Sequence, residues 1–301
     1  MKKSALYYIT LVFFLIVKPG VTQIQDDSGL VWLLQGKNNS VFLAGSLHLL
    51  SKKNYPLPTA FQSAYKESEV VVFEMHPDSA QTAQAQRLMI NIAQYPGGED
   101  LTKNLRDTVL QRLREVCDSL SLNPEQFYPY KPWYVSVALT MAQLQKLGFK
   151  SQLGVDHFFF NKAKKDGKEI RGLESFKDQL QLLSELSDLE QEDLLRQTFS
   201  QMFTVKTELD SIVHAWYKGD LSSLERTLTQ NLYKYPDLAV KFLSQRNKKW
   251  IRHILSYLEE KDDFMVIVGS GHFPGKNGLL QLLKDEGFNP VRMSGRIEHT
   301  E

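Results

Sequence analysis

Apolar residues form short continuous runs near both ends of the chain. Residues 29–35 and 40–44 are two such stretches, and Gly36-Lys37-Asn38-Asn39 between them predicts the turn of a β-hairpin. Residues 69–73 (Glu-Val-Val-Val-Phe) and 264–268 (Phe-Met-Val-Ile-Val) are apolar runs typical of strands buried on both faces. Segments from both ends of the chain are therefore expected to share one sheet.

Between these runs, from about residue 80 to 260, the apolar pattern is helical. Residues 101–122 carry apolar side chains at 105, 109, 110, 113 and 116, and residues 180–203 are rich in Leu, Glu and Gln. One strand is predicted at 168–173, and a helix over 275–287 precedes a last strand at 289–293. We therefore predict an α/β fold: a mixed central sheet built from N- and C-terminal segments, with a large helical insertion at about 80–260, in a single domain covering 23–301.

The first 22 residues have the layout of a secretory signal peptide. Met1-Lys2-Lys3 is a short positive region, residues 4–17 are uncharged and mostly apolar, and Lys18-Pro19-Gly20 ends the run. No clear Ala-x-Ala-like cleavage site follows, so an uncleaved membrane anchor stays open as an alternative. We expect a periplasmic or secreted protein that contacts a membrane only if this segment is retained.

The composition limits which class of protein and which kind of metal site this sequence can form. The chain has 301 residues, 42% of them hydrophobic, and a formal net charge of +1, which is ordinary for a globular protein. Nucleic-acid binding needs a concentrated excess of Lys and Arg, so we expect no such partner. Cys117 is the single cysteine, which excludes an intramolecular disulfide and a multi-cysteine zinc site. A metal would have to be held by His and carboxylates.

Metal-competent side chains follow three of the predicted strands. The runs end in Gly45-Ser46-Leu47-His48, Glu74-Met75-His76 and Gly269-Ser270-Gly271-His272. In open α/β sheets the ligand crevice lies beyond the carboxyl ends of the strands, so these side chains are expected to converge. Gly45 and Gly269 are expected to let the backbone leave the strand in a conformation that other residues resist and to allow close approach, and with Gly271 to shape the site.

Two His and one Glu form the donor set used where a divalent ion keeps a position open for water. The alternatives are that each His is an ordinary loop residue and that Glu74 is a helix N-cap or a surface carboxylate. On spacing alone both interpretations stay open. His76 is a further candidate, two residues beyond Glu74. No dinucleotide fingerprint, nucleophile elbow or Walker sequence is present.

Taken together, the two Gly-x-x-His motifs and Glu74 resemble the TraB/GumN family, which includes the Tiki metalloproteases and is similar in fold to erythromycin esterase and the haem-binding ChaN proteins. The resemblance covers about residues 30 to 295. Further segments that agree are Tyr130-Lys131-Pro132-Trp133, Gly154-Val155-Asp156, Gly172-Leu173-Glu174-Ser175 with Gln179, and Gly271-His272-Phe273-Pro274-Gly275.

This resemblance implies that His48, Glu74 and His272 are the catalytic, metal-binding set. Asp156 matches the Gly-Val-Asp position and is a further ligand, an orienting residue or a helix N-cap. Glu174 also matches, without an assigned role. The leading hypothesis is a secreted hydrolase dependent on a divalent metal (Mn, Co or Zn), acting on a peptide through metal-activated water. The alternatives are a non-catalytic protein that binds haem or another ligand, and an esterase for small molecules.

Overall fold

The computed structural model describes residues 28–202, 204–229 and 239–294. They form two compact units: a helical unit of residues 78–149 and 175–206, and a sheet unit made of the described residues within 13–77, 150–174 and 207–301. The predicted signal peptide at 1–22 lies outside the described residues. Within the described part of the chain, no helix is long and apolar enough to span a bilayer.

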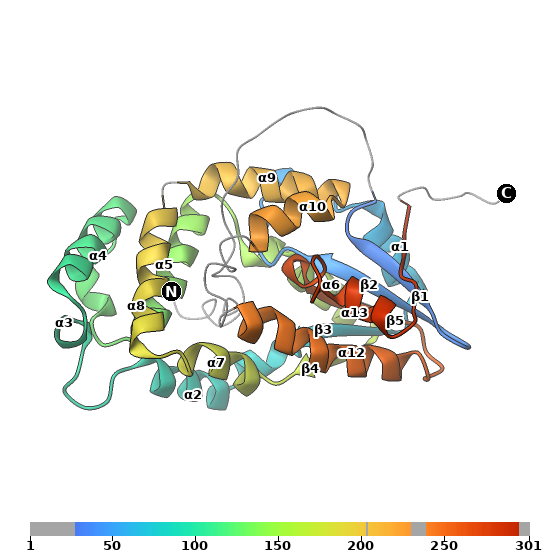
Figure 1. Cartoon of the computed structure of the whole chain (residues 1–301), viewed down its shortest axis with the longest axis horizontal. Coiled ribbons are helices and arrows are strands. Elements are labelled where there is room, and N and C mark those ends of the chain that lie inside the picture. The colour runs from blue at the N-terminus through green and yellow to red at the C-terminus, as the bar shows by residue number, and fades with distance from the viewer. Residues whose placement is uncertain (1–27, 203, 230–238, 295–301) are drawn as a thin grey trace. The chain divides into compact units, whose positions relative to one another are not determined.

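The sheet unit is built on a six-stranded mixed sheet in the order β4-β3-β5-β2-β1-β6 (Figure 1). Neighbours among β2, β5, β3 and β4 pair in parallel, whereas β1 pairs antiparallel with β2 and β6. The strand bounds are β1 Val31–Gln35, β2 Ser40–Ser46, β3 Val70–Met75, β4 Glu169–Glu174, β5 Phe264–Gly269 and β6 Val291–Arg292. The carboxyl ends of the four parallel strands therefore lie at one edge of the sheet.

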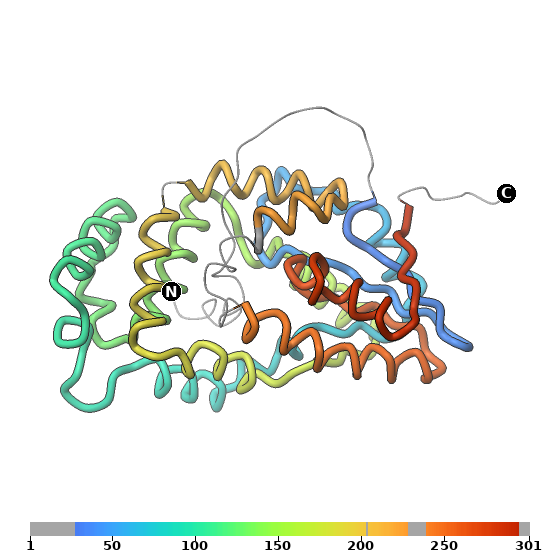
Figure 2. Tube along the Cα trace, in the orientation of Figure 1, coloured from blue at the N-terminus to red at the C-terminus, as the bar shows by residue number. Residues whose placement is uncertain are grey.

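Both the fold class and the predicted hairpin are confirmed. Val31 pairs with Ala44 and Gln35 with Ser40 across the turn at 36–39. The sheet joins both ends of the chain, because β2 lies beside β5, and Figure 2 shows the blue and red segments adjacent. The apolar runs in β3 and β5 are buried throughout from Val70 to Phe73 and from Phe264 to Val268, as continuous apolar strands require.

Predicted boundaries are wrong at several elements, among them β3 and the last helix. Strand β3 continues through Glu74 to Met75, because parallel pairing with β4 extends to Met75 opposite Glu174. The last helix, α13 Leu279–Asp285, begins later than predicted. Gly275 has a φ of +82°, a left-handed conformation that interrupts a helix, and Gly278 occupies the N-cap.

The helices of the sheet unit include α6, which packs against β3 and β4, and α1, which packs against β1. Helix α12 packs against α13. The bounds are α1 Thr59–Glu67, α6 Val155–Asp166, α9 Val205–Lys218 (residues 207–218 within this unit), α10 Leu221–Leu224 and α12 Gln245–Tyr257. A short 3₁₀ turn, Ser270–His272, directly follows β5.

The helical unit contains α2 Ala83–Ala93, α3 Leu101–Asn104, α4 Asp107–Leu120, α5 Pro132–Lys146, α7 Phe176–Ser184 and α8 Asp188–Gln201. Its core joins α4, α5 and α8 through side chains such as Leu113, Leu139 and Leu195, with the free thiol of Cys117 buried among them. The predicted helical pattern at 101–122 is confirmed, with a break between α3 and α4.

The predicted insertion does not fall into one unit, because the described residues within 150–174 and 207–260 belong to the sheet unit, including the correctly predicted strand β4. The single domain stays a prediction.

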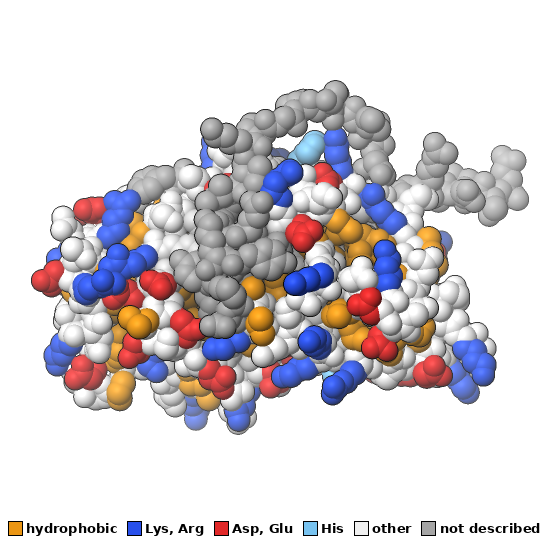
Figure 3. Space-filling model, viewed as in Figure 1, with side chains coloured by type: hydrophobic (Ala, Val, Ile, Leu, Met, Phe, Trp, Pro, Cys, Tyr) orange, Lys and Arg blue, Asp and Glu red, His pale blue; other side chains and the backbone are white. Residues whose placement is uncertain are grey.

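On the face drawn in Figure 3, Lys and Arg side chains are interspersed with Asp and Glu.

Candidate functional site

The parallel strands bring the predicted site residues to one edge of the sheet. His48 lies two residues beyond the end of β2, and Glu74 is the fifth residue of β3. His272 closes the 3₁₀ turn after β5, which lies between β2 and β3 in the sheet. Residues 224 positions apart in the sequence thus meet because their strands are neighbours.

His48, Glu74 and His272 form a cluster around one carboxylate oxygen. The Nε2 atoms of His48 and His272 lie 3.8 Å and 3.9 Å from Glu74 Oε1. The Glu74 and His272 side chains are buried, whereas 17% of the His48 side chain is exposed. The three residues are brought together as expected, and their catalytic and metal-binding roles stay predictions.

Asp156 joins this cluster from the first turn of α6. Its Oδ2 lies 2.7 Å from His48 Nδ1, and its Oδ1 accepts a hydrogen bond of 3.0 Å from the Ser46 hydroxyl. The N-cap alternative is wrong, because Gly154 is the N-cap of α6. A Cβ at Gly154 would overlap the His48 carbonyl oxygen, so the glycine is what lets α6 approach this loop. Asp156 therefore orients His48.

Asp156 also controls the charge of His48. Burial alone would lower the pKa of His48, but attraction to Asp156, the hydrogen bond between them and the negative charge of Glu74 outweigh it and raise the pKa to about 9. In the metal-free protein His48 is therefore an imidazolium at neutral pH, held between two carboxylates.

Arg246 is a site residue that the sequence pattern did not reveal. It is the second residue of α12 and its side chain is only 4% exposed. Its Nη2 lies 2.5 Å from both Glu74 Oε2 and Glu174 Oε1, which gives Glu174 a role. Burial would raise the pKa of Glu74, but Arg246, the two histidines and the Gly269 N–H lower it to about 2. Glu74 is thus held ionised.

Asn247, the next residue of α12, fixes His272. Its amide nitrogen donates to the carbonyl oxygens of His272 (3.2 Å) and Asn277 (2.8 Å), so its Oδ1 faces His272 Nδ1 at 2.6 Å. An amide oxygen only accepts, hence the proton of His272 is on Nδ1 and its Nε2 carries the lone pair. Burial and the charge of Arg246 lower the pKa of His272 to about 3, so this ring is neutral.

The glycines shape the site because they lack a side chain, and not because their backbone conformation is unusual. Neither Gly45 nor Gly269 has a positive φ, so the expected unusual backbone is wrong at both. A Cβ at Gly269 would lie 3.2 Å from Glu74 Oε1 and 3.5 Å from His48 Nε2, so the glycine keeps the centre of the cluster open. Gly45 instead contacts Leu30 in the core, and Gly271 is buried in the turn before His272.

His76 takes a different position from the other candidates. Its ring lies edge-on against Phe160 of α6, with the ring centroids 6.2 Å apart. The strand ends at Met75, before His76, so the alternation that would place it on the face of Glu74 does not continue.

The donor set fits a divalent metal in its chemistry. Two imidazoles whose outer nitrogens are held by Asp156 and Asn247, with one carboxylate, match the usual pattern of metal-binding histidines. As the side chains lie, no group of three or more His, Cys, Asp or Glu in the described residues is arranged to hold an ion. Ligands around a tetrahedral ion lie about 3.3 Å apart, so separations of 3.8 and 3.9 Å require a small contraction.

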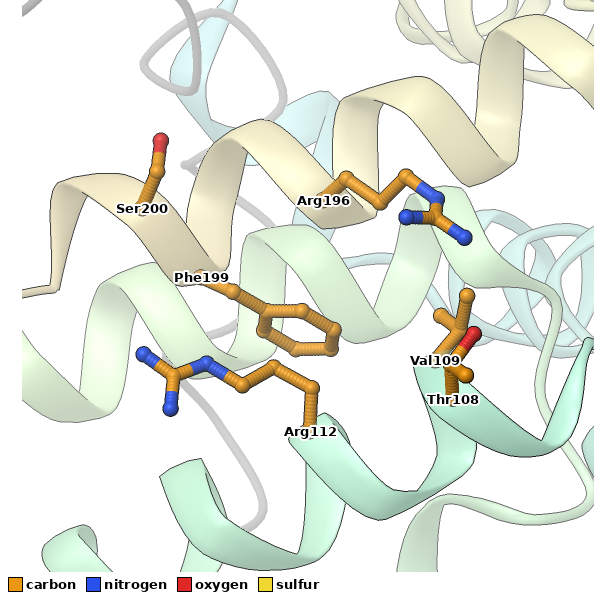
Figure 4. Close-up of a pocket in the computed structure, with 6 residues that line it drawn as sticks. All are labelled: Thr108, Val109, Arg112, Arg196, Phe199 and Ser200. Carbon is orange, nitrogen blue, oxygen red and sulfur yellow. The ribbon is translucent and has the colours of Figure 1, made fainter.

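A separate cavity of about 210 Å³ lies in the helical unit, between α4 and α8. Figure 4 shows the guanidinium groups of Arg112 and Arg196 extending in opposite directions from the Phe199 ring. Each arginine pairs with a glutamate of its own helix. The lining holds no His or carboxylate, so it lacks the chemistry of the cluster; it consists of Thr108, Val109, Arg112, Arg196, Phe199 and Ser200.

Comparison with known proteins relates the chain to one protein family and to a bacterial and a human protein. The model of the TraB/PrgY/gumN family matches residues 30–292. "Uncharacterized protein YbaP" of Escherichia coli (strain K12) is 25% identical over 251 residues, covering 82% of this chain and 89% of that protein. Human "Metalloprotease TIKI1" is 24% identical over 321 residues, covering 88% of this chain and 62% of that protein. No solved structure matches.

Proposed function

The chain belongs to the TraB/PrgY/gumN family, and we propose that it is a hydrolase that binds a divalent metal ion between His48, Glu74 and His272 and cleaves peptides. The observation that carries this proposal is the pair of Nε2 atoms that face one Glu74 oxygen at 3.8 and 3.9 Å. Two imidazoles and a carboxylate leave coordination positions for water and substrate.

When bound, such an ion supplies Lewis-acid chemistry, since it activates water and polarises a carbonyl group. The residues of the chain prepare the site for it. Asp156 holds His48 through Nδ1, Asn247 keeps the proton of His272 on Nδ1 so that Nε2 carries the lone pair, and Gly269 leaves the centre open. Because His48 is the most exposed of the three, water and substrate reach the site on its side.

The substrate class rests on the human relative, whose name is that of a metalloprotease. Peptide and ester hydrolysis both require attack of water on a carbonyl, so the proposed chemistry suits either reaction, and the assay below compares peptides with esters. We further propose that the protein works in the periplasm or outside the cell, because residues 1–22 have the layout of a signal peptide. Fractionation of cells expressing the full chain, with N-terminal sequencing of the mature form, tests this location.

The catalytic proposal is tested with metal-depleted protein reloaded separately with Mn²⁺, Co²⁺ or Zn²⁺. Quenched fluorescent peptides and p-nitrophenyl esters are assayed side by side, for wild type, Glu74→Gln and the exposed control Glu99→Gln. We expect peptide cleavage that a chelator abolishes, a loss of at least about a hundredfold in Glu74→Gln, and no change in the control. Chelator-resistant cleavage contradicts the proposal. Soret absorbance on haem titration without hydrolysis supports the ligand-binding alternative instead.

A further inference from the structure

Arg246 lies against Glu74, Glu174 and His272, and each of its side-chain N–H groups has a hydrogen-bond acceptor. Its Nε donates to Glu174 Oε1 at 3.1 Å, and its Nη2 donates to Glu74 and Glu174. Its Nη1 donates to the Phe242 carbonyl oxygen at 3.3 Å and lies 3.2 Å from His272 Nε2. The guanidinium therefore has no N–H left to bind substrate, and acts on the residues around it.

The contact with His272 has a defined direction. A guanidinium only donates, so His272 Nε2 must accept from Nη1, which agrees with the proton on Nδ1 that Asn247 requires. The lone pair of Nε2 is therefore directed at Arg246. A metal ion at His272 needs that same lone pair, so the hydrogen bond from Arg246 and a metal ion exclude each other at this nitrogen.

We infer that Arg246 competes with the metal ion for His272: it holds the coordinating nitrogen in the metal-free protein and must withdraw its Nη1 hydrogen bond for the ion to bind. This inference rests on the proposed metal site. Arg246 is consequently a positioning residue that lowers metal affinity. Its positive charge also repels a cation at the site. The guanidinium packs against the Trp250 ring, with its central carbon 4.5 Å from the ring centroid.

The test uses a double variant, Arg246→Gln with Glu174→Gln. Removing one positive and one negative side chain leaves the net charge around Glu74 unchanged, and no buried Glu174 carboxylate is left without its arginine. The matched control is Arg106→Gln with Glu192→Gln, a second Arg–Glu pair that lies in the helical unit. The binding of Mn²⁺, Co²⁺ and Zn²⁺ to the metal-free full chain is measured by calorimetry, with circular dichroism to check the fold.

Because a hydrogen bond from a charged group is lost when the metal binds, we expect the Arg246/Glu174 double variant to bind metal at least about tenfold more tightly than wild type. The control should match wild type. Metal binding with equal or weaker affinity in the Arg246/Glu174 variant overturns the inference and leaves the metal site standing. Absence of metal binding in wild type and both variants overturns the proposed function, and this inference with it.

A second measurement covers the case in which the double variant does not fold. In wild-type protein, NMR of the Arg246 side-chain N–H groups is recorded before and after Zn²⁺ is added. We expect the signal of the Nη1 hydrogen bonded to His272 to shift on Zn²⁺ binding. Bound Zn²⁺ with unchanged Arg246 signals overturns the inference.

Discussion

Replacing Asp156 with Asn tests how the charge of His48 is set. The substitution is isosteric and keeps an acceptor 2.7 Å from His48 Nδ1, but removes the negative charge. That charge is a main reason why the pKa of His48 rises from 6.5 to about 9, because burial alone would lower it. We therefore expect His48 to titrate near or below pH 6.5 in metal-free Asp156→Asn protein, as followed by NMR of its ring protons.

The same change has a predictable effect on stability. A histidine whose pKa is raised on folding contributes stability that is fully present below pH 6.5 and is lost as the pH rises through about 9. The rise in the pKa of His48 from 6.5 to about 9 corresponds to about 3 kcal/mol of folding free energy. With chelator present, urea denaturation should show Asp156→Asn less stable than wild type by about 3 kcal/mol at pH 6, and the gap should close above about pH 10.

A surface carboxylate provides the control for this experiment. Asp210 pairs with Lys53 at 2.8 Å, and both side chains are more than half exposed. Asp210→Asn should change stability by less than about 1 kcal/mol at either pH. A destabilisation by Asp156→Asn that does not depend on pH, or an unchanged His48 titration, would refute the account of the Asp156–His48 pair.

Substitutions at three further positions, Gly269, Asn247 and Glu74, probe the rest of the site. Gly269→Ala places a methyl group 3.2 Å from Glu74 Oε1, so metal affinity and hydrolysis should fall at least about tenfold, whereas Gly97→Ala, where a Cβ meets nothing within 4 Å, should behave as wild type. Asn247→Leu leaves buried polar groups unpaired, so the free energy of unfolding in urea should fall by about 3 kcal/mol. Asn247→Asp keeps an oxygen acceptor opposite His272 Nδ1, so ¹⁵N NMR should still show the His272 proton on Nδ1. A proton on Nε2 would contradict the assignment. In metal-free protein, the lowered pKa of Glu74 gives stability that is present above pH 4.5 and lost as the pH falls through about 2; the advantage over Glu74→Gln should therefore shrink by about 3 kcal/mol on acidification, and a pH-independent gap would contradict it.

The strands and the candidate cluster were predictable because their signals are local. Continuous apolar runs identified β3 and β5, and Gly36-Lys37-Asn38-Asn39 identified the hairpin. Once these segments belong to one parallel sheet, residues at their carboxyl ends must share an edge, which is why His48, Glu74 and His272 meet.

Arg246 and Asn247 were not predictable in the same way. They lie in the polar run Gln245-Arg246-Asn247-Lys248-Lys249, which by composition resembles an exposed helix start. The burial of Arg246 depends on its pairing with Glu74 and Glu174, which are 172 and 72 residues away in the sequence, and Asn247 bonds to His272, 25 residues away. A weak signal was available, since Asn247 lies three residues before buried Trp250 and thus on the apolar face of α12. Glu174 matched the family without an assigned role, and this was a second sign that an unidentified buried cation pairs with it.

The division into two compact units also had no local signal. Residues 150–174 return to the sheet through α6 and β4 after the first helices of the other unit. Their pattern of apolar positions does not say which core they join. Long-range packing decides that, and it is invisible in any single segment of the sequence.

We propose a metal-dependent hydrolytic site at His48, Glu74 and His272. Its most direct test is metal content and peptide cleavage measured on the same preparations of wild type, His48→Ala and Glu74→Ala, each with its fold checked by circular dichroism. We expect about one divalent ion per chain and peptide cleavage in wild type, with both lost in the two folded variants. Cleavage by metal-free wild type, or folded variants that keep both the ion and the activity, would contradict it.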